Sequence, residues 1–208
     1  MRISEIFLSI QGEGIETGLP TIFIRLSGCN LKCSWCDTKY SNSLKGKEMS
    51  INQILKKCEK FKIKRICITG GEPLVQKKEC LELIRLLIKR KYEIIIETNG
   101  SIDIENIPKK TIISLDIKCP SSRMHDKMLY KNIKFIGKKD QVKFIIGNNE
   151  DYEFAKKQIR KYNLEKKTNV IFQPVYQNNF TKSLIRKILK DKLDVKFGLQ
   201  VHKIVNIK

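Results

Sequence analysis

GCNLKCSWCDT, residues 28–38, carries three cysteines within eight residues at a Cys-x3-Cys-x2-Cys spacing. An apolar run at 21–26 comes directly before it and predicts a buried strand that ends at this loop. A structural zinc site needs four protein ligands, and no fourth cysteine or histidine follows at zinc-ligand spacing. Three thiolates on one loop, those of Cys29, Cys33 and Cys36, therefore favour a [4Fe-4S] cluster with one iron open to a ligand that is not protein.

Length and composition predict a single cytoplasmic domain over residues 1–208. The N-terminus lacks the pattern of a signal peptide, and no apolar run approaches the roughly 20 residues of a membrane span, so we expect no membrane partner. An odd number of cysteines, seven, in an intracellular chain argues against a disulfide framework. The four cysteines outside the loop stand singly in apolar or helical contexts, where we expect them to pack: Cys58, Cys67, Cys80 and Cys119.

The formal charge of +20 is high enough to raise the question of nucleic-acid binding. Lysines are spread through nearly every predicted helix and loop, however, and neither an arginine-rich stripe nor a set of stacking aromatic residues stands out. We interpret the charge as a compositional bias of solvated positions and expect no specific nucleic-acid partner. Weak, nonspecific association with RNA remains compatible with the electric field of such a chain.

Predicted strands alternate with predicted helices along most of the chain. This order indicates an α/β fold of mostly parallel strands with right-handed crossovers, either an open sheet or part of a barrel. The segment 119–137 gives no clear pattern and is expected to replace a helix with a loop. The predicted strands are 3–10, 21–27, 65–69, 92–97, 111–117, 141–146, 170–175 and 195–201, and the predicted helices are 50–60, 76–89, 150–162 and one that includes 184–189.

Five polar or glycine-rich motifs follow predicted strands directly. In sheets of this kind, active groups gather at the C-terminal ends of the strands. We therefore expect the five motifs to meet at one rim of the sheet. They are 11–14, 29–38, 70–73, 98–100 and Lys118.

Two of these motifs resemble the radical S-adenosylmethionine superfamily. One is the cysteine loop, with Trp35 at the aromatic position before its last cysteine, and the other is Gly70-Gly71-Glu72-Pro73. The resemblance implies an abridged, partial βα barrel with its cofactors at the C-terminal rim of the strands. It also implies that the open iron binds S-adenosylmethionine, whose reductive cleavage gives a 5'-deoxyadenosyl radical.

The superfamily resemblance also implies contacts to S-adenosylmethionine. Glycine lets the backbone approach a ligand closely, and a carboxylate can accept hydrogen bonds from the ammonium group of S-adenosylmethionine. For Gln173, a satisfied polar group at a strand end is an equally good interpretation. The implied contacts are Trp35, Gly70, Gly71, Glu72, Asn99, Ser114, Lys118 and Gln173.

A wider set of motifs resembles the 7-carboxy-7-deazaguanine synthase family over almost the full chain. The resemblance implies a carbon-nitrogen lyase of queuosine and deazapurine biosynthesis that converts 6-carboxy-5,6,7,8-tetrahydropterin to 7-carboxy-7-deazaguanine with loss of ammonia. It implies catalytic use of S-adenosylmethionine, a Mg²⁺ ion, a homodimer, and an external flavodoxin-like or ferredoxin-like one-electron reductant. No catalytic residue is implied beyond the cofactor-derived radical. The motifs are 11–14, Arg25, 36–38, 97–100, 114–118 and 200–203.

The substrate positions suit a carboxylated pterin. Glu13 can accept hydrogen bonds from the donors on the pyrimidine edge, and the guanidinium of Arg25 can bind a carboxylate through two hydrogen bonds. Alternatively, Arg25 forms an ion pair with Glu13 or Glu97, and His202 is structural. The family places Mg²⁺ at Thr38, and a hydroxyl is a suitable oxygen ligand. The implied substrate contacts are Gln11, Glu13, Gly14, Arg25, Thr98, His202 and Lys208.

Two other functions remain compatible with the pattern. A small activating enzyme that installs a glycyl radical on a partner protein shares the cysteine loop but needs no pterin site. A basic RNA-binding protein with a structural metal knuckle would hold zinc instead of iron. The visible spectrum of anaerobically purified protein separates the second from the radical enzymes, because cysteine-ligated iron-sulfur clusters absorb near ~400 nm.

Overall fold

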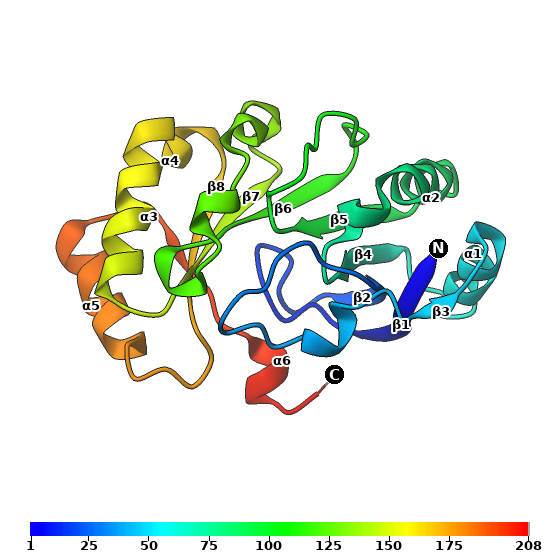
Figure 1. Ribbon diagram of the computed structural model, residues 1–208, viewed down its shortest axis with the longest axis horizontal. Coiled ribbons are helices and arrows are strands. Elements are labelled where there is room, and N and C mark those ends of the chain that lie inside the picture. The colour runs from blue at the N-terminus through cyan, green and yellow to red at the C-terminus, as the bar shows by residue number, and fades with distance from the viewer. Residues whose placement is uncertain (208) are drawn as a thin grey trace.

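The computed structural model describes residues 1–207 as a nine-stranded sheet with helices packed around its outer side (Figure 1). The strand order is β3-β1-β2-β4-β5-β6-β7-β8-β9, so β3 and β9 form open edges and the barrel is partial. The strands from β2 to β9 run parallel, whereas β1 is antiparallel to both β2 and β3. The strands are β1 (Arg2–Ile10), β2 (Pro20–Leu26), β3 (Lys47–Glu48), β4 (Arg65–Gly70), β5 (Glu93–Thr98), β6 (Ile112–Ile117), β7 (Gln141–Ile146), β8 (Asn169–Pro174) and β9 (Lys196–Phe197).

The helices cover the outer side of the sheet in two groups, with α1 and α2 at one end and α3, α4 and α5 at the other (Figure 1). Helix α1 begins at a capping box, in which the Ser50 hydroxyl accepts a hydrogen bond from the backbone of Gln53 and the Gln53 side chain accepts one from the backbone of Ser50. The helices are α1 (Ile51–Glu59), α2 (Lys77–Lys89), α3 (Asn149–Tyr162), α4 (Leu164–Lys167), α5 (Thr181–Asp191) and α6 (Val201–Ile204). The predicted α/β order is confirmed.

Each strand divides its side chains between the helices and an inner, concave face. In β2, Ile22 and Ile24 are fully buried against the helices, whereas Phe23 belongs to a small inner cluster with Cys67 and Ile95. Alternate residues of a strand point to opposite faces of the sheet. The residues two positions after these three are Arg25, Thr69 and Glu97, so the inner face is apolar near the strand starts and polar near the strand ends.

The C-terminal segment differs from its prediction. The expected strand 195–201 is wrong beyond β9, because Gly198 donates to the Phe172 carbonyl and the chain then leaves the sheet. The backbone N–H of Val201 donates to the carbonyl of Gly12, and residues from Val201 onward form α6. His202 therefore lies on a short helix held by a long-range contact, which a local pattern cannot reveal.

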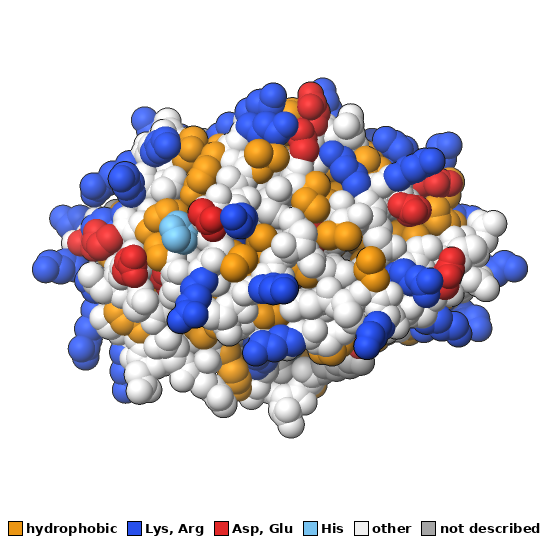
Figure 2. All heavy atoms as spheres, in the orientation of Figure 1, with side chains coloured by type: hydrophobic (Ala, Val, Ile, Leu, Met, Phe, Trp, Pro, Cys, Tyr) orange, Lys and Arg blue, Asp and Glu red, His pale blue; other side chains and the backbone are white. Residues whose placement is uncertain are grey.

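The expectations for the segment 119–137 and for the four cysteines outside the loop agree with the structure. The segment 119–137 contains no α-helix and is built from short 3₁₀ helices at Pro120–Ser122, His125–Lys127 and Tyr130–Phe135. The four cysteines outside the loop are free and fully buried, as expected for packing residues. Within residues 1–207, none of the helices combines the length and the apolar character that crossing a membrane requires. Lysine and arginine side chains are scattered over the face in Figure 2 without forming a continuous stripe.

Candidate functional site

A cavity of about 540 Å³ occupies the concave face of the sheet and is open to solvent. It is bounded by the cysteine loop, the inner residues of the strands and the C-terminal segment. Most of the predicted site residues line it. They are Gln11, Glu13, Arg25, Cys29, Cys33, Trp35, Cys36, Thr38, Gly70, Gly71, Thr98, Asn99, Lys118, Gln173 and His202.

Three predicted site residues do not line the cavity. Gly14 and Ser114 are both next to Gln141 instead: a side chain at Gly14 would meet Gln141, and Gln141 donates to the Ser114 hydroxyl at 2.8 Å. Glu72 is fully buried beneath the rim. Lys208, the last predicted substrate contact, lies outside the described residues.

Gln11 to Gly14 reach the site from an unexpected direction. Because β1 runs antiparallel to β2, its end at Ile10 pairs with Pro20, at the edge of the sheet opposite Leu26 and Gly70. The expectation that all five motifs share the C-terminal rim is therefore wrong for 11–14. The loop enters the hollow from the other edge and reaches the polar part of the inner face, where the Gln11 amide lies 3.4 Å from Glu97 Oε1.

The cysteine loop is held by residues that follow β6. The backbone N–H of Ser34 donates to the Ser122 carbonyl at 3.1 Å, and the Trp35 indole N–H donates to the Ser121 hydroxyl at 3.1 Å. Ser121 donates in turn to Asp151 Oδ2 at 2.5 Å, and Asp151 is fully buried at the start of α3. The loop is thus fixed against the β6–β7 connection and the first turn of a helix.

The three loop cysteines, here called the cluster cysteines, fit the ligand set of a [4Fe-4S] cluster. All three thiols are free, half-buried and face the cavity, and burial raises the pKa of Cys29 and of Cys33. Over residues 1–207, no three His, Cys, Asp or Glu side chains are grouped to hold a single metal ion. Thiols that share a hollow without converging on one point suit a cubane, in which each thiolate binds a different iron.

The rim beside the cluster cysteines is built from strand ends without side chains. A Cβ on Gly71 would lie 2.5 Å from the carbonyl oxygen of Gly28 and 2.7 Å from Cys29 Cβ, closer than real side chains approach. Gly70 has φ +155°, and its Cβ would lie 2.2 Å from the carbonyl oxygen of Leu26. Only glycine allows β4 to end this close to the loop, which leaves backbone groups exposed to a ligand.

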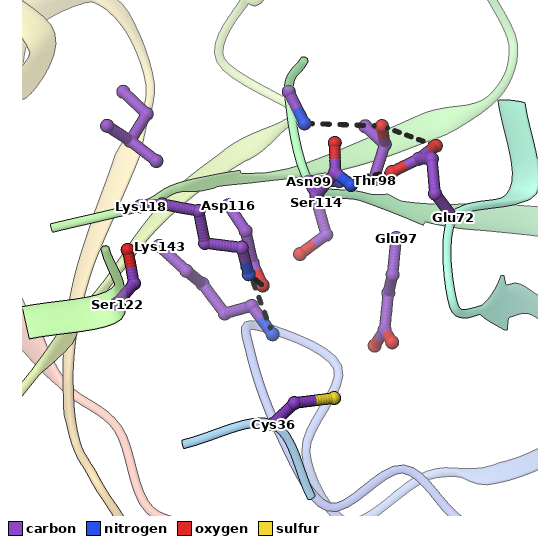
Figure 3. A network of polar contacts seen from close by, with 12 residues as sticks. Cys36, Glu72, Glu97, Thr98, Asn99, Ser114, Asp116, Lys118, Ser122 and Lys143 are labelled. Atoms are coloured by element: carbon purple, nitrogen blue, oxygen red, sulfur yellow. Dashed lines mark hydrogen bonds and ion pairs between the residues drawn. The ribbon is translucent and has the colours of Figure 1, made fainter. Parts of the chain in front are cut away.

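Glu72 joins the ends of two strands under this rim (Figure 3). Its carboxylate accepts from the Thr98 hydroxyl at 2.9 Å, from the Asn99 backbone at 2.6 Å and from the Leu74 backbone at 3.0 Å. Burial raises the pKa of Glu72 to about 7, although these hydrogen bonds act in the opposite direction. Glu72 therefore supports Thr98 and Asn99, which line the cavity, instead of facing a ligand itself.

The polar part of the inner face carries buried charges of both signs (Figure 3). Lys118 Nζ lies 3.2 Å from Asp116 Oδ2 and 5.4 Å from the centre of the Trp35 ring. Lys143 Nζ lies 2.7 Å from Glu13 Oε2 and 3.5 Å from Asp116 Oδ1. Buried charges of this kind persist when they are paired, and here the pairs line a hollow large enough for ligands.

Arg25 also faces the cavity, and its ion pair differs from the one considered above. Its Nε donates to Glu5 Oε1 at 2.9 Å, whereas the sequence suggests, as the alternative to carboxylate binding, an ion pair with Glu13 or Glu97. Glu97 is instead bound by the Thr69 hydroxyl at 2.9 Å. The pairing with Glu5 uses Nε, so the terminal nitrogens of the guanidinium keep donors for an anion.

The C-terminal segment covers part of the hollow. Gln200 donates to Glu13 Oε1 at 2.8 Å, and the Lys203 ammonium bonds Asp37 of the cysteine loop. A Cβ on Gly12 would lie 2.1 Å from His202 Nδ1, so glycine at this position lets the imidazole pack against the loop. This segment connects the cysteine loop to the 11–14 loop across the cavity mouth.

Sequence reasoning missed Lys143 and Thr69 as cavity residues, and it named Asp116 only as part of the motif 114–118. The signal was present, because period-two alternation along each strand places these residues on the same face as Arg25. A lysine inside the apolar run 141–146 is as costly to bury unpaired as an arginine inside 21–26.

Comparison with known proteins gives consistent matches. The sequence pattern of the Radical SAM superfamily matches residues 23–191. A 7-carboxy-7-deazaguanine synthase of Koribacter versatilis is 36% identical, covering 99% of this chain and 96% of the relative. One of Methanospirillum hungatei is 39% identical, covering 100% of this chain and 86% of the relative. The crystal structure of QueE from Escherichia coli superimposes with a TM-score of 0.79 and 26% identity, covering 97% of this chain and 94% of that one.

Proposed function

Because the chain belongs to the radical SAM superfamily and, within it, to the 7-carboxy-7-deazaguanine synthases, we propose that it is the lyase that forms 7-carboxy-7-deazaguanine. The substrate is 6-carboxy-5,6,7,8-tetrahydropterin, and ammonia is lost. One observation carries the proposal: a single cavity brings the cluster cysteines together with Gln11, Glu13 and Arg25. Neither a glycyl-radical activating enzyme nor an RNA-binding protein is favoured by relatives matched over nearly their full length.

The residues around the cluster loop suit the two cofactors. The cluster cysteines would hold the iron-sulfur cluster, and the strand ends at Gly70, Gly71 and Asn99 would hold S-adenosylmethionine, with Lys118 and Gln173 nearby. When bound, these groups supply a 5'-deoxyadenosyl radical. Gln173 Oε1 is buried and has no hydrogen-bond partner within the described residues, as expected for a side chain that awaits a ligand.

The opposite side of the cavity suits the pterin. Glu13 accepts the N–H donors of the pyrimidine edge, and Gln11 offers both a donor and an acceptor. Arg25 binds the substrate carboxylate through the terminal nitrogens that its pairing with Glu5 through Nε leaves available. Thr38, two residues after the last cluster cysteine, would add a hydroxyl ligand for Mg²⁺ beside that carboxylate.

The covering C-terminal segment would exclude water during the reaction. Its bonds to Glu13 and Asp37 hold it against both sides of the hollow. A reactive carbon radical requires such exclusion, because side reactions with solvent and oxygen compete with rearrangement. His202 lines the cavity from this segment and is a substrate contact in this proposal.

We also propose a cytoplasmic homodimer that receives electrons from a flavodoxin-like or ferredoxin-like donor. Seven free cysteines suit a reducing compartment. The charge of +20 is complementary to an acidic donor protein. Exposed apolar residues of the C-terminal segment, Ile204 and Val205, would be covered by a second copy. Sedimentation equilibrium tests the dimer, which a monomer at micromolar concentration would contradict.

The test of the function is anaerobic reconstitution with iron and sulfide, followed by incubation with a reductant, S-adenosylmethionine and the carboxy-tetrahydropterin. We expect 7-carboxy-7-deazaguanine and ammonia, with many products formed for each S-adenosylmethionine consumed. Absence of the deazaguanine, or consumption of one S-adenosylmethionine per turnover, would contradict the proposal. Two measurements test the role of Mg²⁺: the rate in the presence of a chelator, and the rate of the Thr38→Ala variant. If neither rate is lowered, Mg²⁺ takes no part in the reaction.

A further inference from the structure

Lys143 is a buried cation in the cavity wall that the proposed function leaves without a role. It lies in the middle of β7, and its side chain is only 4% exposed. The two nearest carboxylates come from different parts of the chain: Glu13 from the loop after β1 and Asp116 from the neighbouring strand β6, where it is the register partner of Lys143. A lysine is retained in such a place only where its charge is used or fully compensated.

Three carboxylates and one ammonium group face Lys143. Glu13, Asp116 and Glu97 attract its ammonium, and Lys118 repels it. Asp116 is shared, because Lys118 binds its other oxygen at 3.2 Å. The closest contact of Lys143 is therefore with Glu13, at 2.7 Å.

This contact fixes what Glu13 can do. Lys143 binds Oε2 and Gln200 binds Oε1, and both partners donate. Burial alone would raise the pKa of Glu13, but the charge and hydrogen bond of Lys143, with smaller contributions from hydrogen bonds of Gln200 and Gln173, outweigh it and lower the pKa to about 2. Glu13 is thus an ionised group that only accepts hydrogen bonds, held with both oxygens in known positions and with lone pairs left for a ligand.

We propose that Lys143 is a positioning residue that makes the cavity select a ring with two adjacent N–H donors over a ring with a carbonyl in place of one of them. The inference rests on the proposed function, which places a pterin edge against Glu13. A pterin presents a ring N–H and an exocyclic amino group there. A lumazine presents the same ring N–H beside a carbonyl, whose oxygen would face the carboxylate without a hydrogen between them. Without Lys143, Glu13 can take a proton and donate to that carbonyl.

The test uses the reconstituted holoenzyme with S-adenosylmethionine and two unreactive probes, 6-carboxypterin and 6-carboxylumazine. Both are aromatic and have no hydrogen on C6, so they bind without reacting. Anaerobic equilibrium dialysis gives the ratio of their dissociation constants. The natural chain should prefer the pterin by roughly 10- to 100-fold, the contribution of a hydrogen bond to a charged group. Lys143→Met should reduce the preference to about threefold or less, whereas Lys143→Arg, which keeps the charge, should retain most of it.

A ratio separates this role from a structural one, because general loosening of the cavity weakens both probes alike. Lys138→Met, an exposed lysine just before β7, is the matched control and should behave as the natural chain. A Lys143→Met protein with the natural preference would overturn the proposal. If that variant does not fold, the double variant Lys143→Met/Glu13→Gln removes both charges of the pair, and a natural preference in it would overturn the proposal as well.

Failure of the proposed function gives a different result. If the natural chain shows a Lys143-dependent preference but forms no deazaguanine, the proposed reaction is wrong and the proposed role of Lys143 in ligand selection is confirmed. If it forms deazaguanine but Lys143→Met leaves the preference unchanged, the reaction stands and the role of Lys143 is wrong.

Discussion

The pH dependence of stability should report the buried carboxyl group of Glu72. Burial raises its pKa from the usual 4.5 to about 7, so the folded state keeps this proton to a higher pH than the unfolded state does. The group therefore contributes stability that is fully present below about pH 4.5 and is lost as the pH rises through about 7. For this difference, the loss between pH 5 and pH 8 is about 2 to 3 kcal/mol.

The perturbation is Glu72→Gln, which keeps the size and one acceptor oxygen but does not titrate. The glutamine amide meets the donors at Leu74 and Asn99 less well than a carboxylate, which lowers stability by an amount that does not depend on pH. The difference in unfolding free energy, natural chain minus variant, should therefore fall by about 2 to 3 kcal/mol between pH 5 and pH 8.

Urea unfolding of cluster-free protein, kept reduced and followed by circular dichroism at pH 5, 6.5 and 8, measures this difference. Glu82→Gln, on the exposed side of α2, is the control and should show no such change. Glu13, whose pKa is lowered to about 2, loses its contribution only at more acidic pH and does not interfere. Parallel curves for the natural chain and Glu72→Gln would refute the reasoning.

Three further predictions concern the site. Asp151→Ala removes the acceptor that holds Ser121, and Ser121 in turn accepts from the indole of Trp35, the one tryptophan. The fluorescence emission of Trp35 should therefore shift to longer wavelength, and the unfolding free energy should fall by about 3 kcal/mol. An unchanged emission spectrum would contradict the anchoring of the loop by Asp151. Alanine at any cluster cysteine should abolish absorbance near ~400 nm after reconstitution, whereas Cys58→Ala should keep it. Arg25→Gln should raise the KM for the carboxy-pterin roughly 10- to 100-fold in steady-state assays; weakened S-adenosylmethionine binding in dialysis would show a general defect instead.

Much of the fold could be predicted from the sequence because local patterns and tertiary packing agree. The inner strands of a parallel sheet are buried on both faces and read as apolar runs, and the predicted 141–146 matches β7 at both ends. Ser50 and Gln53 mark the start of α1 by their side-chain chemistry. The prediction for the segment after Phe197 is wrong because the path of this segment depends on a hydrogen bond to Gly12, far away in the sequence.

The site was predictable in its chemistry and less so in its geometry. The spacing of the cluster cysteines and the need for glycine at Gly71 are local properties. The direction of β1 is not a local property, because the run 3–10 has the same pattern in a parallel or an antiparallel pair. The predicted edge for the entry of Gln11 was therefore wrong. Glu72 was expected to face a ligand, but its side chain turns toward backbone N–H groups that only the folded strands bring near it.

The antiparallel direction of β1 makes the site modular. The loop that would read the substrate ring enters from one edge of the sheet, and the loops that would hold the cofactors stand at the other, so the two halves share a hollow but not a backbone segment. Exchange of residues 11–19 can then change which heterocycle is accepted while the radical-generating half stays intact. Divergence toward new substrates, in nature or in the laboratory, has a short and separable stretch of chain on which to act.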